Sequence, residues 1–164
     1  MNRGVLAFGL GCVLRRRNVY RKRILEVGSR NVNGSLRPFV RAFLPREYIG
    51  VDIVPGRGVD EICDVYELRH RFDVYSFDGV ICTEMIEHVE DYSTAVIIMR
   101  SMVAPGGWMF LSAPGPGFPP HDYPHDYHRF TPQDLIGLLD GWDVEAYGRT
   151  VENESCAFGR RPRG

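Results

Sequence analysis

The sequence predicts an α/β fold in which helices cover both faces of an open, mainly parallel sheet. Two observations favour this prediction. Short apolar runs alternate with helix-type segments along the 164 residues, which is typical of βαβ units. The first of these runs, residues 24–27, is followed by a glycine turn. The second, residues 48–53, has an acid near its end. Such residues are expected where parallel strands end beside a ligand.

The first predicted strand leads into a turn suited to a nucleotide. Its apolar run, residues 24–27, is interrupted only by Glu26, whose carboxylate is costly to bury unless a nearby group uses it. Gly28 permits a sharp turn, and Gly34 leads into a helix predicted over residues 36–44. A turn of this kind places free backbone N–H groups and the positive end of a helix beside a cavity at the edge of the sheet.

The second predicted strand places an acid at the same edge. Asp52 follows Gly28 by 24 positions, and a carboxylate there can accept hydrogen bonds from both hydroxyls of a ribose. A dinucleotide fingerprint would also need glycines where Arg30 and Asn33 stand. The sequence therefore indicates a nucleotide-type ligand but disfavours an NAD-dependent oxidoreductase.

Glu26 two residues before Gly28, followed by Asp52, resembles the pattern of class I S-adenosylmethionine (SAM)-dependent methyltransferases, and the segment 77–89 resembles the fourth motif of that family. The resemblance covers residues 23–162. It implies a Rossmann-like, doubly wound, seven-stranded and mostly parallel sheet with an antiparallel last strand and helices on both faces. It also implies SAM as the cofactor, bound by residues from four segments: Glu26, Gly28, Ser29, Asn33 and Gly34; Asp52 and Ile53; Asp64 and Val65; Thr83, Glu84 and Met85.

Asp64 has two interpretations. It follows a short third strand predicted over residues 59–63, and at that position the resemblance implies an acid that binds the exocyclic amine of adenine. The alternative is a loop acid that caps a helix predicted over residues 65–69. Because Asp64 belongs to the same sheet edge as Glu26 and Asp52, we favour the cofactor role.

The rest of the chain supplies the remaining elements. A helix with an apolar face is predicted over residues 91–103. A second helix is predicted to begin with Thr131 as its N-cap and to end before Gly141. The remaining predicted strands are residues 77–82, 108–113, 142–147 and 154–158.

A long loop over residues 114–130 contains the triplet His-Asp-Tyr twice. A loop of this length is uncommon in a compact domain unless it has a function. Histidine titrates near neutral pH and suits the removal of a proton from a hydroxyl acceptor. We take His125, His128 and His88 as the catalytic candidates; His121 and Tyr127 are further groups of the same kind.

A metal site is an alternative interpretation of the segment after the fourth strand. Glu84, Glu87 and His88 have the spacing that could bring them together on one helical turn. With a histidine of the long loop added, the element is similar to the Glu-x-x-Glu-His metal sites of ubiquinone-pathway O-methyltransferases and small-RNA terminal methyltransferases. In other relatives the same element only packs and orients, so we assign no metal.

Composition and charge limit the partners. The formal net charge of −1 gives no general attraction to nucleic acid or anionic membranes. Four widely spaced cysteines indicate free thiols in a reducing cytoplasm. The apolar run of residues 4–14 is too short for a bilayer, which takes about 20 residues. We expect it to form a helix in an N-terminal arm, residues 1–22, that packs on one domain, residues 23–164.

The function predicted is transfer of a methyl group from SAM to an O or N nucleophile of an acceptor, with a small metabolite or glycan-type molecule favoured. Nucleic acid is less favoured, although the basic run of residues 15–23 would suit phosphate. No membrane span is expected, and a homo-oligomer is compatible with the sequence. The alternatives are a degenerate methyltransferase-like scaffold, suggested by Arg30 and Asn33, and a metal-assisted O-methyltransferase acting on RNA or a small molecule.

Overall fold

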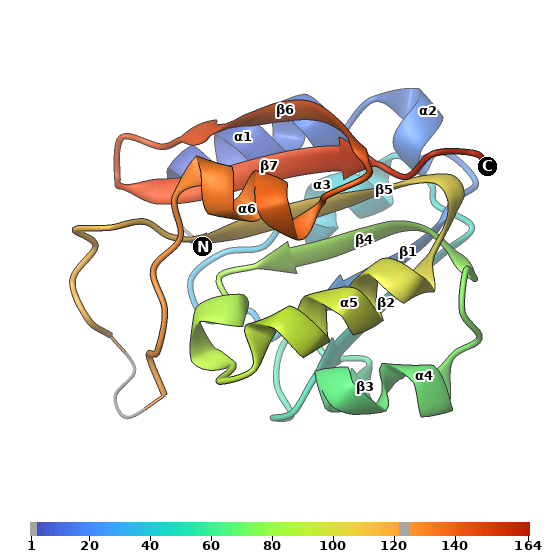
Figure 1. The fold of residues 1–164 in the computed structure, drawn as a ribbon. Coiled ribbons are helices and arrows are strands. Elements are labelled where there is room, and N and C mark those ends of the chain that lie inside the picture. The colour runs from blue at the N-terminus through green and yellow to red at the C-terminus, as the bar shows by residue number, and fades with distance from the viewer. Residues whose placement is uncertain (1–2, 122–124) are drawn as a thin grey trace.

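A computed structural model describes residues 3–121 and 125–164 (Figure 1). The described residues form a seven-stranded sheet in the order β3-β2-β1-β4-β5-β7-β6. Neighbouring strands are parallel except that β7 runs antiparallel to both β5 and β6. The predicted fold class is thus confirmed. The strands are β1 (Arg23–Val27), β2 (Glu47–Asp52), β3 (Glu61–Ile62), β4 (Phe77–Thr83), β5 (Val103–Pro114), β6 (Asp143–Arg149) and β7 (Glu154–Arg160).

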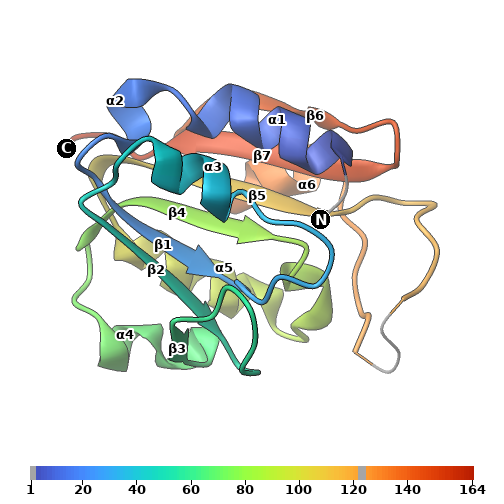
Figure 2. The same ribbon diagram turned by 180° about the vertical axis from the view of Figure 1, so that it is seen from behind.

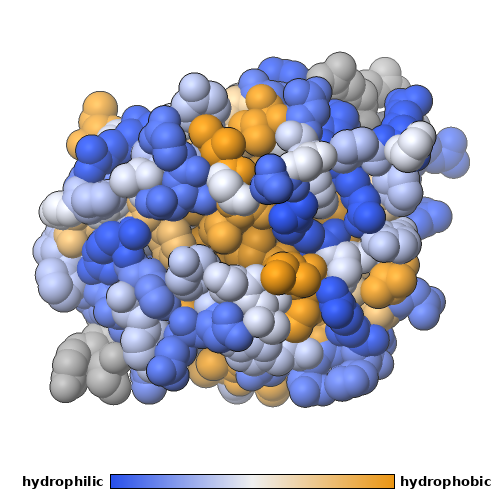
Figure 3. All heavy atoms as spheres, viewed as in Figure 1, coloured by the Kyte–Doolittle hydropathy of each residue, from blue (hydrophilic) through white to orange (hydrophobic). Residues whose placement is uncertain are grey.

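Helices cover both faces of the sheet. One face carries α1 (Arg3–Val13), α2 (Arg16–Val19) and α3 (Arg37–Ala42) (Figure 2). The other carries α4 (Leu68–Arg71), α5 (Tyr92–Met102) and α6 (Pro132–Leu138) (Figure 1). On this second face hydrophobic residues gather near the middle and hydrophilic residues surround them (Figure 3). Two short 3₁₀ turns, η1 (Val65–Glu67) and η2 (Ile86–His88), follow β3 and β4.

The strand register aligns the ends of the central strands. Val27 of β1 pairs with Val51 of β2 on one side and with Cys82 of β4 on the other. The residues that follow therefore leave the sheet at one edge, where Gly28 and Thr83 lie. This is the carboxyl edge, at which open α/β sheets bind their ligands.

Each face of the sheet has its own apolar core. Residues such as Phe77, Met99 and Leu111 pack under α5 and α6. Under α1 and α3 the core includes Val13 and Trp108, and α1 contacts β5 and β7. The four cysteines are free, as predicted. Within the described residues we find no helix with the length and apolarity needed to span a membrane.

The predicted start of the helix after the long loop is confirmed in detail. Thr131 is the N-cap of α6, and its hydroxyl accepts a hydrogen bond from the backbone N–H of Asp134 at 3.2 Å. The Asp134 carboxylate in turn accepts the backbone N–H of Thr131 at 2.7 Å. Gly141, with φ of 76°, follows the helix. This reciprocal arrangement is a capping box.

Several boundaries differ from the sequence prediction. The third strand, expected over residues 59–63, is only Glu61–Ile62, because it is an edge strand whose sole neighbour is β2. The helix expected over residues 65–69 is a 3₁₀ turn continued by the short α4. Strand β5 begins at Val103 rather than Trp108, and its pairing with β4 shifts register around the Pro-Gly-Gly segment.

Candidate active site

Two adjoining cavities lie at the carboxyl edge of the sheet. The first has a volume of about 650 Å³ and the second about 330 Å³, and both are lined by Gly28 and His88. The first is enclosed by the segment after β1, the end of β4, the long loop and the β6–β7 hairpin. The second is enclosed by the ends of β2 and β3, η1 and the segment after β4.

Gly28 forms the boundary between the cavities. Its φ is 73°, a conformation that L side chains rarely adopt. A Cβ atom built on it would lie 2.5 Å from Cγ of Met85. The N–H groups of Gly28 and Ser29 both donate to the carbonyl of Val51 at 3.0 Å. Only glycine therefore fits this turn, as the sequence predicts.

Two of the predicted carboxylates line the second cavity. Asp52 accepts hydrogen bonds from the backbone N–H groups of Arg30 and Val54, each at 3.0 Å. Asp64 caps η1 by accepting the N–H of Tyr66 at 3.0 Å, so the helix-capping interpretation describes its contacts correctly. Although it caps η1, Asp64 lines the same cavity as Asp52. The other predicted residues there are Ile53, Val65 and Met85.

Glu26 lies in the first cavity rather than the second, so the three carboxylates are divided between the two hollows. It is 3% exposed and accepts hydrogen bonds from Tyr48 Oη at 2.9 Å and Ser35 Oγ at 3.3 Å. Burial raises the pKa of Glu26 to about 7. The other predicted residues in this cavity are Gly28, Ser29, Asn33, Gly34, Thr83 and Glu84.

Glu84 follows the end of β4 with a backbone φ of 51°, which is unusual for a residue with a side chain. Ser112 of β5 donates a hydrogen bond to its carboxylate at 2.7 Å. Burial raises the pKa of Glu84 to about 7 as well. With Glu152 and Glu154 on the same wall, the first cavity is rich in carboxylates and therefore suits a ligand with positive charge.

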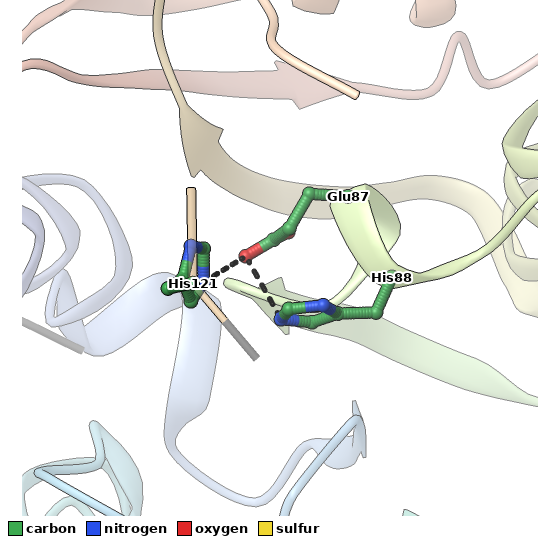
Figure 4. A group of neighbouring side chains, drawn as sticks. All are labelled: Glu87, His88 and His121. Carbon is green, nitrogen blue, oxygen red and sulfur yellow. Dashed lines mark ion pairs between the residues drawn. The ribbon is translucent and has the colours of Figure 1, made fainter. Parts of the chain in front are cut away.

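A third buried carboxylate stands behind the first cavity. Glu87 is fully buried, and neither of its side-chain oxygens has a hydrogen-bond partner among the described residues. Its Oε1 lies 3.6 Å from Nε2 of His88 and 3.9 Å from Nε2 of His121 (Figure 4). Burial, together with the nearby Glu84, raises the pKa of Glu87. The ligand-type atoms of these three residues lie within 4.8 Å of one another.

A second contact orients the imidazole of His88, and another holds the backbone of His121. Nδ1 of His88 is 2.6 Å from the carbonyl oxygen of His125, and because a carbonyl can only accept, Nδ1 carries the hydrogen. In the neutral ring, Nε2 then presents a lone pair toward Glu87. Asp126 accepts the backbone N–H of His121 at 2.7 Å and pairs with Arg129. The arrangement places a carboxylate and two ring nitrogens around one small space.

The chain matches a known protein family along most of its length. Residues 9–148 match the family described as "Methyltransferase domain". The chain belongs to this family. The resemblance to SAM-dependent methyltransferases noted in the sequence is thereby confirmed, as is SAM as the cofactor that such a domain uses.

Relatives of this methyltransferase domain share only parts of it. A ubiquinone biosynthesis O-methyltransferase of Vibrio atlanticus is 26% identical over 111 residues, which are 58% of this chain and 47% of that protein. One from Paraburkholderia phymatum is 51% identical over 37 residues, 23% of this chain. That match spans 16% of the relative's length. The 1,6-didemethyltoxoflavin-N1-methyltransferase of Burkholderia thailandensis, solved with bound S-adenosylhomocysteine, shares the fold with a TM-score of 0.74. The two chains are 17% identical in sequence, and the match covers 98% of this chain and 77% of that one.

The histidines of the methyltransferase domain are distributed differently from the expectation. His88 lines both cavities, but His125 and His128 line neither of them. Nδ1 of His125 is 3.0 Å from Tyr127 Oη, while Nε2 of His128 is 3.0 Å from the carbonyl of Glu90. The loop contributes Phe118 and His121 to the first cavity.

Asp122 of the first His-Asp-Tyr triplet lies outside the described residues. The sequence signal for His121 was the triplet itself, which occurs twice and offers two equivalent histidines. Only the path of the loop distinguishes them.

Proposed function

We propose that this domain transfers a methyl group from SAM to an O or N nucleophile of a small acceptor. The observation that carries the proposal is the pair of cavities meeting at Gly28, one bordered by Asp52 and Asp64 and the other by Glu26. The fit to SAM is chemical. Its ribose and adenine offer hydrogen-bond donors to Asp52 and Asp64. Its ammonium group would suit the buried carboxylate of Glu26, whose pKa burial raises to about 7.

When bound, SAM supplies the methyl group and a neutral leaving group. The domain mainly has to orient the two reactants and exclude water. Asp52, Asp64 and the Gly28 turn would hold the nucleoside, and Glu26 the amino-acid part. The space beside His88 and His121 remains for the acceptor, and a neutral imidazole there can take a proton from a hydroxyl or amine. A small acceptor is supported by the Burkholderia thailandensis structure, which contains bound 1,6-didemethyltoxoflavin, a small molecule, together with S-adenosylhomocysteine.

A thermal shift assay tests the proposal. A ligand that binds only the folded state raises the melting temperature in proportion to the logarithm of its excess over Kd. SAM and S-adenosylhomocysteine should both raise it, and NADH should not. A shift with NADH alone would indicate an oxidoreductase, and no shift with any of the three would indicate a scaffold that has lost its cofactor.

A metal-assisted O-methyltransferase is the second candidate, and one observation favours it. The carboxylate of Glu87 is buried without a hydrogen-bond partner among the described residues, beside His88 and His121. One carboxylate and two imidazoles form a donor set that accepts Mn²⁺, Zn²⁺ or Mg²⁺ with water completing the shell. A cation there would supply Lewis-acid activation of an acceptor hydroxyl.

Calorimetric titration with each of these ions would test the metal. Binding should be lost in Glu87→Gln and in His121→Ala but retained in the matched variant His128→Ala, because His128 lies outside the cluster. Equal binding in all variants would remove the metal from this site and leave the first proposal unaffected.

A further inference from the structure

The charges of this chain are distributed very unevenly along the sequence. Residues 1–46 contain eleven of the 20 Lys and Arg residues and only one of the 21 Asp and Glu residues, the buried Glu26. The rest of the chain is correspondingly acidic. The net charge of −1 therefore hides a strongly basic segment and a strongly acidic one.

The basic segment supplies the helices of one layer of the fold, together with strand β1. Residues 1–46 contain α1, α2 and α3, which together cover one face of the sheet (Figure 2). Four of its cations are paired with acids from elsewhere: Arg15 with Glu145, Lys22 with Asp78, Arg23 with Glu47 and Arg37 with Asp60. Pairing therefore neutralises only part of this face.

Three exposed arginines of the layer, Arg21, Arg41 and Arg46, form no ion pair with any described residue. They are brought together because the N–H of Arg21 donates to the carbonyl of Leu44 at 3.0 Å and the N–H of Arg46 donates to the carbonyl of Lys22 at 2.8 Å. The side chain of Leu44 is 68% exposed among them, and Phe39, on the preceding turn of α3, is 42% exposed. We call these five residues, Arg21, Phe39, Arg41, Leu44 and Arg46, the basic patch.

Helix α1, in the same layer, has an outer surface without polar side chains. After Arg3, every residue of the helix is apolar or glycine. Val5, Gly9, Cys12 and Val13 are buried, and Leu6, Phe8 and Leu10 pack against the same core, so that after Arg3 the exposed residues of the helix are Ala7 and Gly11. A surface helix normally carries charged residues on its outer side. An apolar outer surface beside unpaired arginines suits a partner that is both apolar and anionic.

From these observations we propose that the α1–α3 face docks on the surface of a bilayer that contains anionic phospholipids. The arginines of the basic patch meet the headgroups, while Phe39, Leu44 and the outer side of α1 enter the boundary with the acyl chains. Lipid is favoured over RNA because an apolar helix surface offers no hydrogen-bond donor or positive charge to the phosphates of a nucleic acid. The proposal concerns this face alone and does not depend on the identity of the methyl acceptor.

Vesicle flotation with the full chain tests the proposal. The protein should float with phosphatidylcholine vesicles containing about 30 mol % phosphatidylglycerol, not with phosphatidylcholine alone, and should dissociate at about 0.5 M NaCl. Replacing Arg21, Arg41 and Arg46 together by Ser should weaken binding roughly tenfold or more. Phe39→Ser, which keeps the charge, should weaken it about threefold or more.

The matched control replaces Arg57, Arg69 and Arg71 by Ser, which removes the same charge outside residues 1–46. It should retain binding, and melting temperatures would verify that every variant is folded. The proposal is overturned if the wild-type chain does not float, if the control loses as much binding as the patch variant, or if Phe39→Ser has no effect. Tighter binding to single-stranded RNA than to vesicles, lost in the patch variant, would assign the face to nucleic acid instead.

Discussion

Tyr48 donates a hydrogen bond to the carboxylate of Glu26 at 2.9 Å, across the two adjacent strands β1 and β2. Both side chains are buried. The hydroxyl stabilises the ionised carboxylate, but burial outweighs it, so the pKa of Glu26 rises from 4.5 to about 7. The site thus contains a buried carboxylate that titrates near neutral pH.

The first prediction concerns stability against pH. Between about pH 4.5 and 7, folded Glu26 keeps a proton that the unfolded chain has released, so the free energy of unfolding should fall as pH rises through this range. Glu26→Gln cannot titrate and should remove up to about 3 kcal/mol of that fall. Urea unfolding at several pH values measures it, with exposed Glu67→Gln as the control. An unchanged slope in Glu26→Gln would show that Glu26 does not titrate in this range.

Gly28→Ala should damage both stability and cofactor binding. The positive φ and the contact of the new Cβ with Met85 should cost about 1–3 kcal/mol in the free energy of unfolding. Gly137→Ala, in α6 with no neighbouring atom within 4 Å, should instead stabilise by about 0.5–1 kcal/mol. The double variant Gly28→Ala with Met85→Ala should recover SAM affinity only in part, because the backbone strain remains. Full affinity in Gly28→Ala alone would contradict the importance of this turn.

The capping box of α6 offers a test of local stability. Thr131→Ala removes the acceptor for the N–H of Asp134 and should lower the free energy of unfolding by about 1 kcal/mol. Thr131→Ser keeps the hydroxyl and should restore most of the loss. Thermal unfolding of both variants measures the difference, and equal stability of Ala and Ser would show that the cap contributes little.

The parts of the fold that local chemistry determines could be predicted from the sequence. The turn at Gly28, the acid at the end of β2 and the N-cap at Thr131 depend on residues close together in the chain, and each is found where it was expected. The length of β3 could not be predicted in the same way. This strand lies at the edge of the sheet and pairs with β2 alone, so the length of β3 depends on the loop that precedes it.

The cluster around Glu87 could be predicted only in part: the sequence spacing brings Glu87 and His88 together, but it does not identify the histidine that the loop adds. His121 follows Glu87 by 34 residues and reaches it through an irregular loop without hydrophobic periodicity. The sequence indicates that the loop carries histidines but not which of them turns toward the sheet. The positive φ of Glu84 likewise occurs where the residue after β4 forms a hydrogen bond with Ser112 of β5, a contact between segments distant in the sequence.

Asp52→Ala provides the most direct test of the cofactor site. The Asp52 carboxylate lines the second cavity at the end of β2, and its loss should remove a charged acceptor from the ribose hydroxyls. We expect SAM affinity to fall by about 1.5–3 kcal/mol in calorimetry. Asp73→Ala removes an exposed acid outside both cavities and should leave the affinity unchanged. Because Asp52 also accepts the N–H groups of Arg30 and Val54, Asp52→Asn, which keeps one acceptor oxygen, separates the two roles. Near-normal stability with weak SAM binding in Asp52→Asn would locate the ribose at this residue, whereas normal binding in both variants would exclude it.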